Sequence, residues 1–160
     1  MRKPFVAGIT ALALLGAVVS LAGTAGATAP TKPPVKLAGG VNNKGTKAVK
    51  ADAVTIEQGD YFFKPTFLKA KAGTTVKVTV KNGGSADHTF TIDSQNIDET
   101  LSAGETTTVD VTVPTNGKPV VFYCRFHGSG GGMQGAFFTK TGAKAKATDS
   151  GSGSSGSGGY

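Results

Sequence analysis

The chain has 160 residues, enough for one domain of ordinary size, and 38% of these residues are hydrophobic. It contains a single cysteine and two histidines, which excludes an intramolecular disulfide and any site that needs many imidazoles. The net charge of +7 does not indicate a nucleic-acid partner, because residues 51–141 carry eight basic and nine acidic side chains, which leaves about −1 there.

The first 27 residues have the pattern of a secretory signal peptide. Arg2 and Lys3 precede an apolar run from Phe5 to Leu21, and small residues follow up to Ala27 in the Ala-x-Ala pattern of a cleavage site. The alternative is a retained membrane anchor, since the seventeen residues of the run lie at the lower edge of spanning length. We expect cleavage of residues 1–27 and a mature protein outside the cytoplasm, in the periplasm, secreted or at the cell surface.

Two further segments are interpreted as lying outside the folded domain. Residues 28–50 are rich in proline, lysine and glycine, and their apolar content is too low for a core, so we interpret them as a linker or arm. The lysines of this arm favour a weak attraction to an anionic membrane or cell-wall surface. Residues 142–160 form a Gly/Ser-rich tail that we expect to be disordered.

Short segments between residues 51 and 141 alternate apolar and polar side chains, with the period of half-buried strands. The clearest is 75–81, in which every second residue is valine. The dipeptide Asn116-Gly117 predicts a hairpin between the strand that ends before Pro114 and the strand that begins at Val120. About seven such strands and no convincing helix after residue 27 predict an all-β fold, an antiparallel β-sandwich.

Segment 120–138 contains the residues that carry chemistry. Cys124, His127 and Met133 offer a thiolate, an imidazole and a thioether, a combination that suits copper better than zinc, calcium or magnesium. His88 is the only other histidine in the chain. The candidate ligand set is therefore His88, Cys124, His127 and Met133, with no choice to be made among alternatives.

The strand pattern places His88 and Cys124 on inward faces. Taken alone, an inward histidine is more often a hydrogen-bonded core residue, and a lone cysteine more often a small buried hydrophobe. Their occurrence together with His127 favours metal ligation instead. Glycine-rich residues 128–132 provide a path nearly free of side chains, along which the chain can return Met133 towards the metal.

The sequence around Cys124 resembles the copper-binding loop of cupredoxins, the plastocyanin-like blue copper proteins. It reads Cys-Arg-Phe-His at 124–127 and Met-Gln-Gly at 133–135, while segment 85–92 is similar to the one that delivers the first histidine ligand. The resemblance covers about residues 51–141 and implies a Greek-key sandwich with one type 1 copper ion at one end. Five residues separate His127 from Met133, one more than in plastocyanin-like loops, and Phe126 stands where many members have proline.

This resemblance implies single-electron transfer between redox proteins, since such ligands serve both Cu(II) and Cu(I). We do not expect an enzyme, because protein ligands fill the strong positions of the metal. Copper storage or delivery would use the same ligands and remains an alternative. So do nucleophilic catalysis by Cys124 with a histidine base, and an adhesion sandwich without metal.

The expected partner is a redox protein, and the expected oligomeric state is a monomer. We expect the outer edge of His127, beside Phe126 and Gly130, to be the port for electrons, because small uncharged rims suit brief docking. We also expect that removing residues 28–48 or 143–160 changes neither the spectrum nor the reduction potential of the copper.

Overall fold

The computed structural model describes residues 32–128 and 130–144. The predicted signal segment 1–27 and residues 145–160 of the predicted tail lie outside this part. Within it, the regular structure consists of strands and a single 3₁₀ turn, η1 (Asp93–Gln95). The all-β fold expected from the sequence is therefore confirmed.

One layer is a four-stranded sheet in the order β4-β3-β6-β9. It is built from β3 (Ala53–Gly59), β4 (Phe62–Lys64), β6 (Thr75–Asn82) and β9 (Thr106–Thr112). β3 pairs in parallel with β6, and β6 pairs antiparallel with β9. The predicted alternation holds on β6, where Val76, Val78 and Val80 are fully buried and the residues between them face outward.

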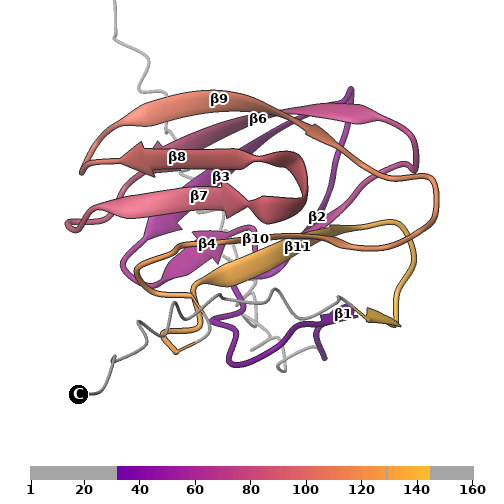
Figure 1. Ribbon diagram of the computed structural model, residues 1–160, viewed down its shortest axis with the longest axis horizontal. Helices are drawn as coiled ribbons and strands as arrows, with labels where there is room; N and C mark the ends of the chain where they lie inside the picture. Colours follow the sequence, from indigo (N-terminus) through magenta and orange to yellow (C-terminus); the bar gives the residue numbers. More distant parts are fainter. Residues whose placement is uncertain (1–31, 129, 145–160) are drawn as a thin grey trace, which may run out of the picture. The chain divides into compact units, whose positions relative to one another are not determined.

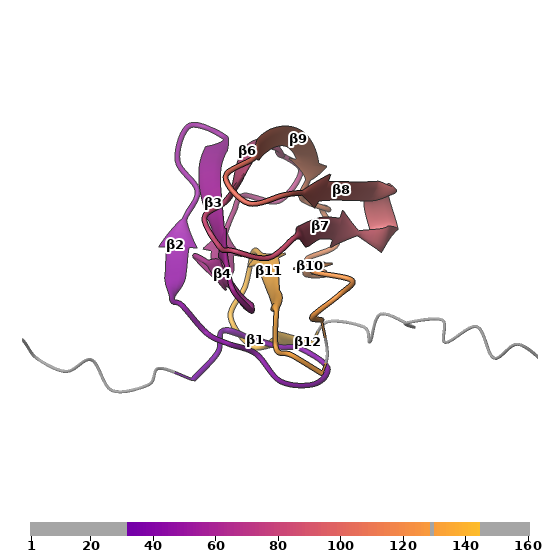
Figure 2. The same ribbon diagram turned by 90° about the vertical axis from the view of Figure 1, so that its left-hand side faces the viewer.

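The second layer is a six-stranded sheet in the order β2-β5-β11-β10-β7-β8. Its strands are β2 (Thr46–Ala48), β5 (Phe67–Lys69), β7 (His88–Ile92), β8 (Ile97–Leu101), β10 (Val120–Tyr123) and β11 (Gln134–Phe138). In Figure 2, β3 lies on one side of the fold and β7 and β10 lie on the other, so that the inner faces of the two sheets enclose a common core.

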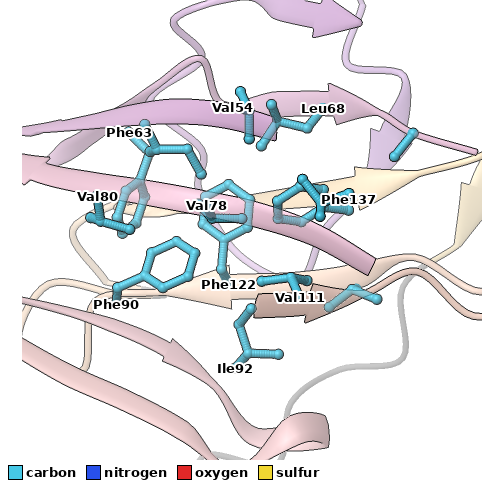
Figure 3. Close-up of a cluster of buried hydrophobic side chains, with 14 of the residues drawn as sticks. Val54, Phe63, Leu68, Val78, Val80, Phe90, Ile92, Val111, Phe122 and Phe137 are labelled. Carbon is cyan, nitrogen blue, oxygen red and sulfur yellow. The ribbon is translucent and has the colours of Figure 1, made fainter. Parts of the chain in front are cut away.

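The centre of this core is a group of four buried phenylalanines, contributed by β4, β7, β10 and β11 (Figure 3). Phe122 contacts the other three, with ring centroids 5.1 Å from Phe63, 5.2 Å from Phe90 and 5.6 Å from Phe137. Such aromatic pairs contribute about 0.5–1.5 kcal/mol each beyond the area that they bury. β10 is thus anchored from both sheets immediately before Cys124.

The arm expected at residues 28–50 differs in the structure, because it contains two strands. β2 pairs in parallel with β5 at the edge of the six-stranded sheet. Val35 and Leu37 are buried against the outer face of that sheet, where they pack on Phe67, Ala136 and Phe138. The few apolar residues of the arm are sufficient here because the sheet presents apolar side chains on both faces, and its outer face needs a cover.

The end of the described chain also differs from the expected tail. Strand β12 (Ala143–Lys144) pairs in parallel with β1 (Val35–Lys36). The amide of Gly142 donates a hydrogen bond to the carbonyl of Pro34, 2.7 Å away. Residues 142–144 therefore belong to the folded part, and the cuts at 28–48 and 143–160 would each remove paired backbone.

The predicted hairpin at Asn116-Gly117 is wrong, although the turn itself is present. Gly117 has a φ of 74°, and the side chain of Asn116 accepts a hydrogen bond from the amide of Lys118. The strands on either side belong to different sheets, because β9 pairs with β6 while β10 pairs with β11 and β7. The Asn-Gly dipeptide specifies the turn locally, whereas the packing of the two sheets determines with which strands β9 and β10 pair.

Four chain segments meet at one end of the sandwich, on the left in Figure 1. They are the turn between β3 and β4, the start of β7, the end of β10 and the start of β11. The four candidate ligands predicted from the sequence lie at the start of β7 and in the loop between β10 and β11. The turn between β3 and β4 contains none of them. Among residues 32–128 and 130–144 there is no helix with the length and hydropathy that a bilayer crossing requires.

Candidate metal centre

Cys124 and Met133 lie at the two ends of the loop that joins β10 to β11. Cys124 follows directly after β10, Met133 directly precedes β11, and both side chains are fully buried. The Cys124 amide donates to the Met133 carbonyl at 3.1 Å, and the Met133 amide donates to the His127 carbonyl, also at 3.1 Å. Backbone hydrogen bonds therefore hold the three loop residues of the predicted set next to one another.

His88 is the first residue of β7, and its side chain is fully buried. The loop before it is held by Asn82, a buried residue at the end of β6. The Asn82 side-chain amide donates to the carbonyls of Ala86 and Leu101 and accepts from the amide of Gly84. The position of His88 is thus determined by both sheets.

The structure brings three of the predicted residues into one cluster. The ligand atoms of His88, Cys124 and His127 all lie within 4.8 Å of one another. The sulfur of Cys124 lies 3.9 Å from Nδ1 of His88 and 3.6 Å from Nδ1 of His127. Trigonal bonds of about 2.0 Å to nitrogen and about 2.3 Å to sulfur would separate these donors by about 3.7 Å. The observed spacing therefore fits a single ion bound between the donors.

The other ring nitrogen of His88 faces a carboxylate. Nε2 of His88 lies 3.4 Å from Oδ1 of Asp60, in the turn between β3 and β4. Metal-binding histidines commonly direct their second nitrogen to such a partner, which fixes the orientation of the ring. Nothing local in the sequence links Asp60 to His88, 28 residues away.

Asp60 is itself held in place by the segment before His88. Its carboxylate accepts hydrogen bonds from the hydroxyl and amide of Ser85 and from the amide of Ala86. These bonds, led by those from Ser85, lower the pKa of Asp60 to about 2. Burial lowers the pKa of His88 and so favours the neutral imidazole, which is the form that binds metals.

The sulfur of Cys124 accepts a hydrogen bond from the backbone. The amide of Thr89 donates to Sγ at 3.3 Å, and the hydroxyl of Thr89 accepts from the amide of Arg125 at 2.8 Å. Thr89 therefore fixes both the position of the cysteine sulfur and the path of the chain after it.

His127 is the partly exposed member of the cluster, and two aromatic side chains flank it. Its ring centroid lies 4.8 Å from that of Tyr61 and 6.2 Å from that of Phe126. Tyr61 and Phe126 are the exposed large hydrophobic residues of the described chain, at 50% and 54% exposure. Phe126 was expected at this rim, whereas Tyr61 was missed because it arrives from the turn between β3 and β4.

The chain matches the family described as the cupredoxin-like domain over residues 17–136, which is 120 of its 160 residues. It therefore belongs to the cupredoxin-like family. No curated protein matches the chain at a significant level.

The solved structures that are similar to the chain include the following three. Reduced auracyanin from Roseiflexus castenholzii is 19% identical, with 56% of this chain and 97% of that one covered and a TM-score of 0.48. Auracyanin A from Chloroflexus aurantiacus, a "blue" copper protein, is 20% identical, with 55% and 99% covered and a TM-score of 0.44. The metal-binding domain of the Cu(I)-exporting ATPase CopA from Streptococcus pneumoniae is 12% identical, with 59% and 93% covered and a TM-score of 0.48.

The family and the donor chemistry together identify the cofactor as one copper ion in a type 1 site. Two imidazoles and a thiolate in one cluster, with a buried thioether on the same loop as the thiolate, are the donors that such a site uses.

Proposed function

We propose that the protein is an exported electron carrier that binds one copper ion through His88, Cys124, His127 and Met133. The observation that carries this proposal is the cluster of His88, Cys124 and His127, of which the first two are buried and the third is partly exposed. Copper bound by this donor set can alternate between Cu(II) and Cu(I) with little change in geometry. The role of the protein is to keep the donor atoms in fixed positions while the copper changes its oxidation state.

The residues around the donors support such a role. His88 and Cys124 are fixed to strands of a packed sandwich, and their side chains are fully buried. Met133 is also buried, and its backbone is bonded to both Cys124 and His127. A donor set supplied entirely by the protein leaves no vacant position for a substrate, which favours electron transfer over catalysis at the metal.

We infer that electrons pass through the partly exposed His127 to a redox protein. Tyr61 and Phe126 form an apolar rim beside its ring, of the kind that suits brief docking over a small area. Arg125 packs over the Phe126 ring at 5.7 Å and pairs with Asp98 at 2.8 Å. This ion pair places one positive and one negative charge at the edge of the rim, where they can orient a partner.

We further propose that residues 1–27 are removed on export and that the protein acts as a monomer outside the cytoplasm. The basis is the Ala-x-Ala pattern after the apolar run. The exposed lysines of β2 and its neighbours, such as Lys44 and Lys47, favour weak contact with an anionic surface. N-terminal sequencing of the exported protein tests the cleavage, and an intact residue 1 in membrane fractions would contradict it.

The experiment that tests electron transfer is voltammetry of the copper-loaded protein, with the copper content measured before and after cycling. We expect a reversible one-electron wave and full retention of copper over many cycles. Loss of copper on each reduction would indicate delivery rather than electron transfer, since the same four residues could serve to bind and release Cu(I).

A further inference from the structure

Residues 38–42 lie along the glycine-rich loop that connects His127 to Met133. The amide of Asn42 donates to the carbonyl of Gly132 at 2.9 Å. At the start of β11, the side-chain amide of Gln134 donates to the carbonyls of Ala38 and Gly40, at 2.6 and 2.7 Å. Met133 is therefore flanked on both sides by residues that are bonded to this N-terminal segment.

The side chain of Asn42 joins two parts of the metal centre. Its Nδ2 donates to the carbonyl of Gly131 at 2.8 Å and to the carbonyl of Tyr61 at 2.7 Å. Gly131 belongs to the loop between His127 and Met133. Tyr61 belongs to the turn between β3 and β4. One amide group thus uses both of its hydrogens to connect the loop to the turn that contacts both histidines.

The loop is packed closely around this connection. A Cβ atom at Gly132, whose φ is +73°, would lie 3.1 Å from the side chain of Asn42. A Cβ atom at Gly131 would lie 2.7 Å from the carbonyl oxygen of His127. Gly131 is therefore required by the close approach of the His127 backbone, and Gly132 by its positive φ and by the Asn42 side chain beside it.

The neighbouring residue Asn43 has a side-chain hydrogen bond that is local in the sequence. Its side chain accepts a hydrogen bond from the amide of Gly45, two residues away. The bonds of the Asn42 side chain, in contrast, span 19 and 89 residues of sequence. Asn42 therefore connects separate elements, whereas Asn43 stabilises one turn.

We propose that Asn42 is a positioning residue of the copper centre. It holds the loop closed over Cys124 and fixes the positions of His127 and Met133 relative to the turn at Tyr61. The effect on copper rests on the function proposed above, but the closure of the loop does not, because it is a property of the metal-free chain as well.

The test compares the full chain with the variants Asn42→Ala and Asn43→Ala, the second being the matched control. The first measurement is amide hydrogen exchange in the metal-free protein. Loss of two hydrogen bonds is expected to speed exchange at Gly132 and Met133 about tenfold or more. Exchange at Val78, in the centre of β6, is expected to stay the same in Asn42→Ala. In Asn43→Ala, exchange at Gly132, Met133 and Val78 is expected to stay the same, and only the Gly45 amide, which loses its acceptor, should exchange faster. An equal acceleration of exchange at Val78 and in the loop would mean that the whole fold is destabilised. No acceleration of exchange would mean that Asn42 does not hold the loop closed. Either result overturns the proposal.

The second measurement is the absorption and paramagnetic resonance spectrum of each variant with Cu(II). We expect both spectra to change in Asn42→Ala and to match the unmodified chain in Asn43→Ala. If the loop amides exchange faster but the copper spectra do not change, Asn42 holds the loop closed without positioning the copper ligands, and the proposal is overturned. If the unmodified chain takes up no copper, the proposed function fails, and hydrogen exchange alone decides whether Asn42 closes the loop.

Discussion

Oδ1 of Asp60 lies 3.4 Å from Nε2 of His88, on the opposite side of the ring from the sulfur of Cys124. The carboxylate receives its other hydrogen bonds from Ser85 and Ala86, just upstream of His88. One acidic residue therefore ties the turn between β3 and β4 to the first histidine of the site.

We predict that Asp60→Ala weakens copper binding about tenfold to a hundredfold, because the ring of His88 loses the partner that orients it. Asp60→Asn keeps an acceptor but removes the negative charge, so it is expected to raise the reduction potential by destabilising Cu(II) relative to Cu(I). Copper titration and voltammetry measure the two effects. Ser85→Ala, which removes one bond to the same carboxylate, is the control. An Asp60→Asn potential equal to that of the control would show that the charge does not act on the metal.

Met133→Leu is predicted to keep copper bound and to raise the reduction potential. An axial thioether bond from Met133 would be weak, and its loss would destabilise Cu(II) more than Cu(I). The side chain is buried, so leucine keeps the packing close to that of methionine. Voltammetry provides the measurement. An unchanged potential would mean that the longer loop keeps Met133 off the metal.

Phe126→Glu is predicted to slow electron exchange with a redox partner about tenfold, since a charge at the rim disfavours docking. The copper spectrum should change little, because the side chain is exposed and lies outside the ligand cluster. Phe126→Leu keeps the rim apolar and serves as the control. Stopped-flow kinetics measure the exchange, and equal rates for the two variants would place the port elsewhere.

Phe122→Ala is predicted to lower the free energy of unfolding of the metal-free protein by about 3–5 kcal/mol, because Phe122 contacts three other buried phenylalanines. Phe126→Ala removes the same atoms from an exposed position and is expected to change it by less than about 0.5 kcal/mol. Urea denaturation compares the two. Similar losses in both variants would contradict the assigned core.

The strands, and three candidate ligands that the structure brings together, could be predicted from local signals and from composition. Alternation along β6 and β10 specifies which side chains face inward, and the spacing of Cys124, His127 and Met133 lies within one loop. His88 completes the set because it is the only other histidine in the chain, and the family resemblance implies the same role. These parts depend on residues that are near each other in the chain or rare in its composition.

The parts that could not be predicted depend on tertiary packing. Val35 and Leu37 are two apolar residues in a polar segment, which does not by itself indicate a fold. Their burial depends on the apolar outer face of β5 and β11, against which they pack. The Asn116-Gly117 turn joins two sheets, although its sequence is equally suited to a hairpin. Asp60 and Asn42 act on the site through contacts across 19 to 89 residues, and no local pattern marks them.

We propose that Cys124 binds copper as a thiolate together with His88 and His127. The most direct test is the visible absorption spectrum of the purified chain on addition of one equivalent of Cu(II), with Cys124→Ser measured beside it. Cys124 is the only cysteine, so no other thiol can give rise to a thiolate-to-copper band. We predict an intense blue or green colour in the unmodified chain and none in Cys124→Ser. A colourless unmodified chain, or a serine variant that keeps the band, would contradict the proposed copper centre.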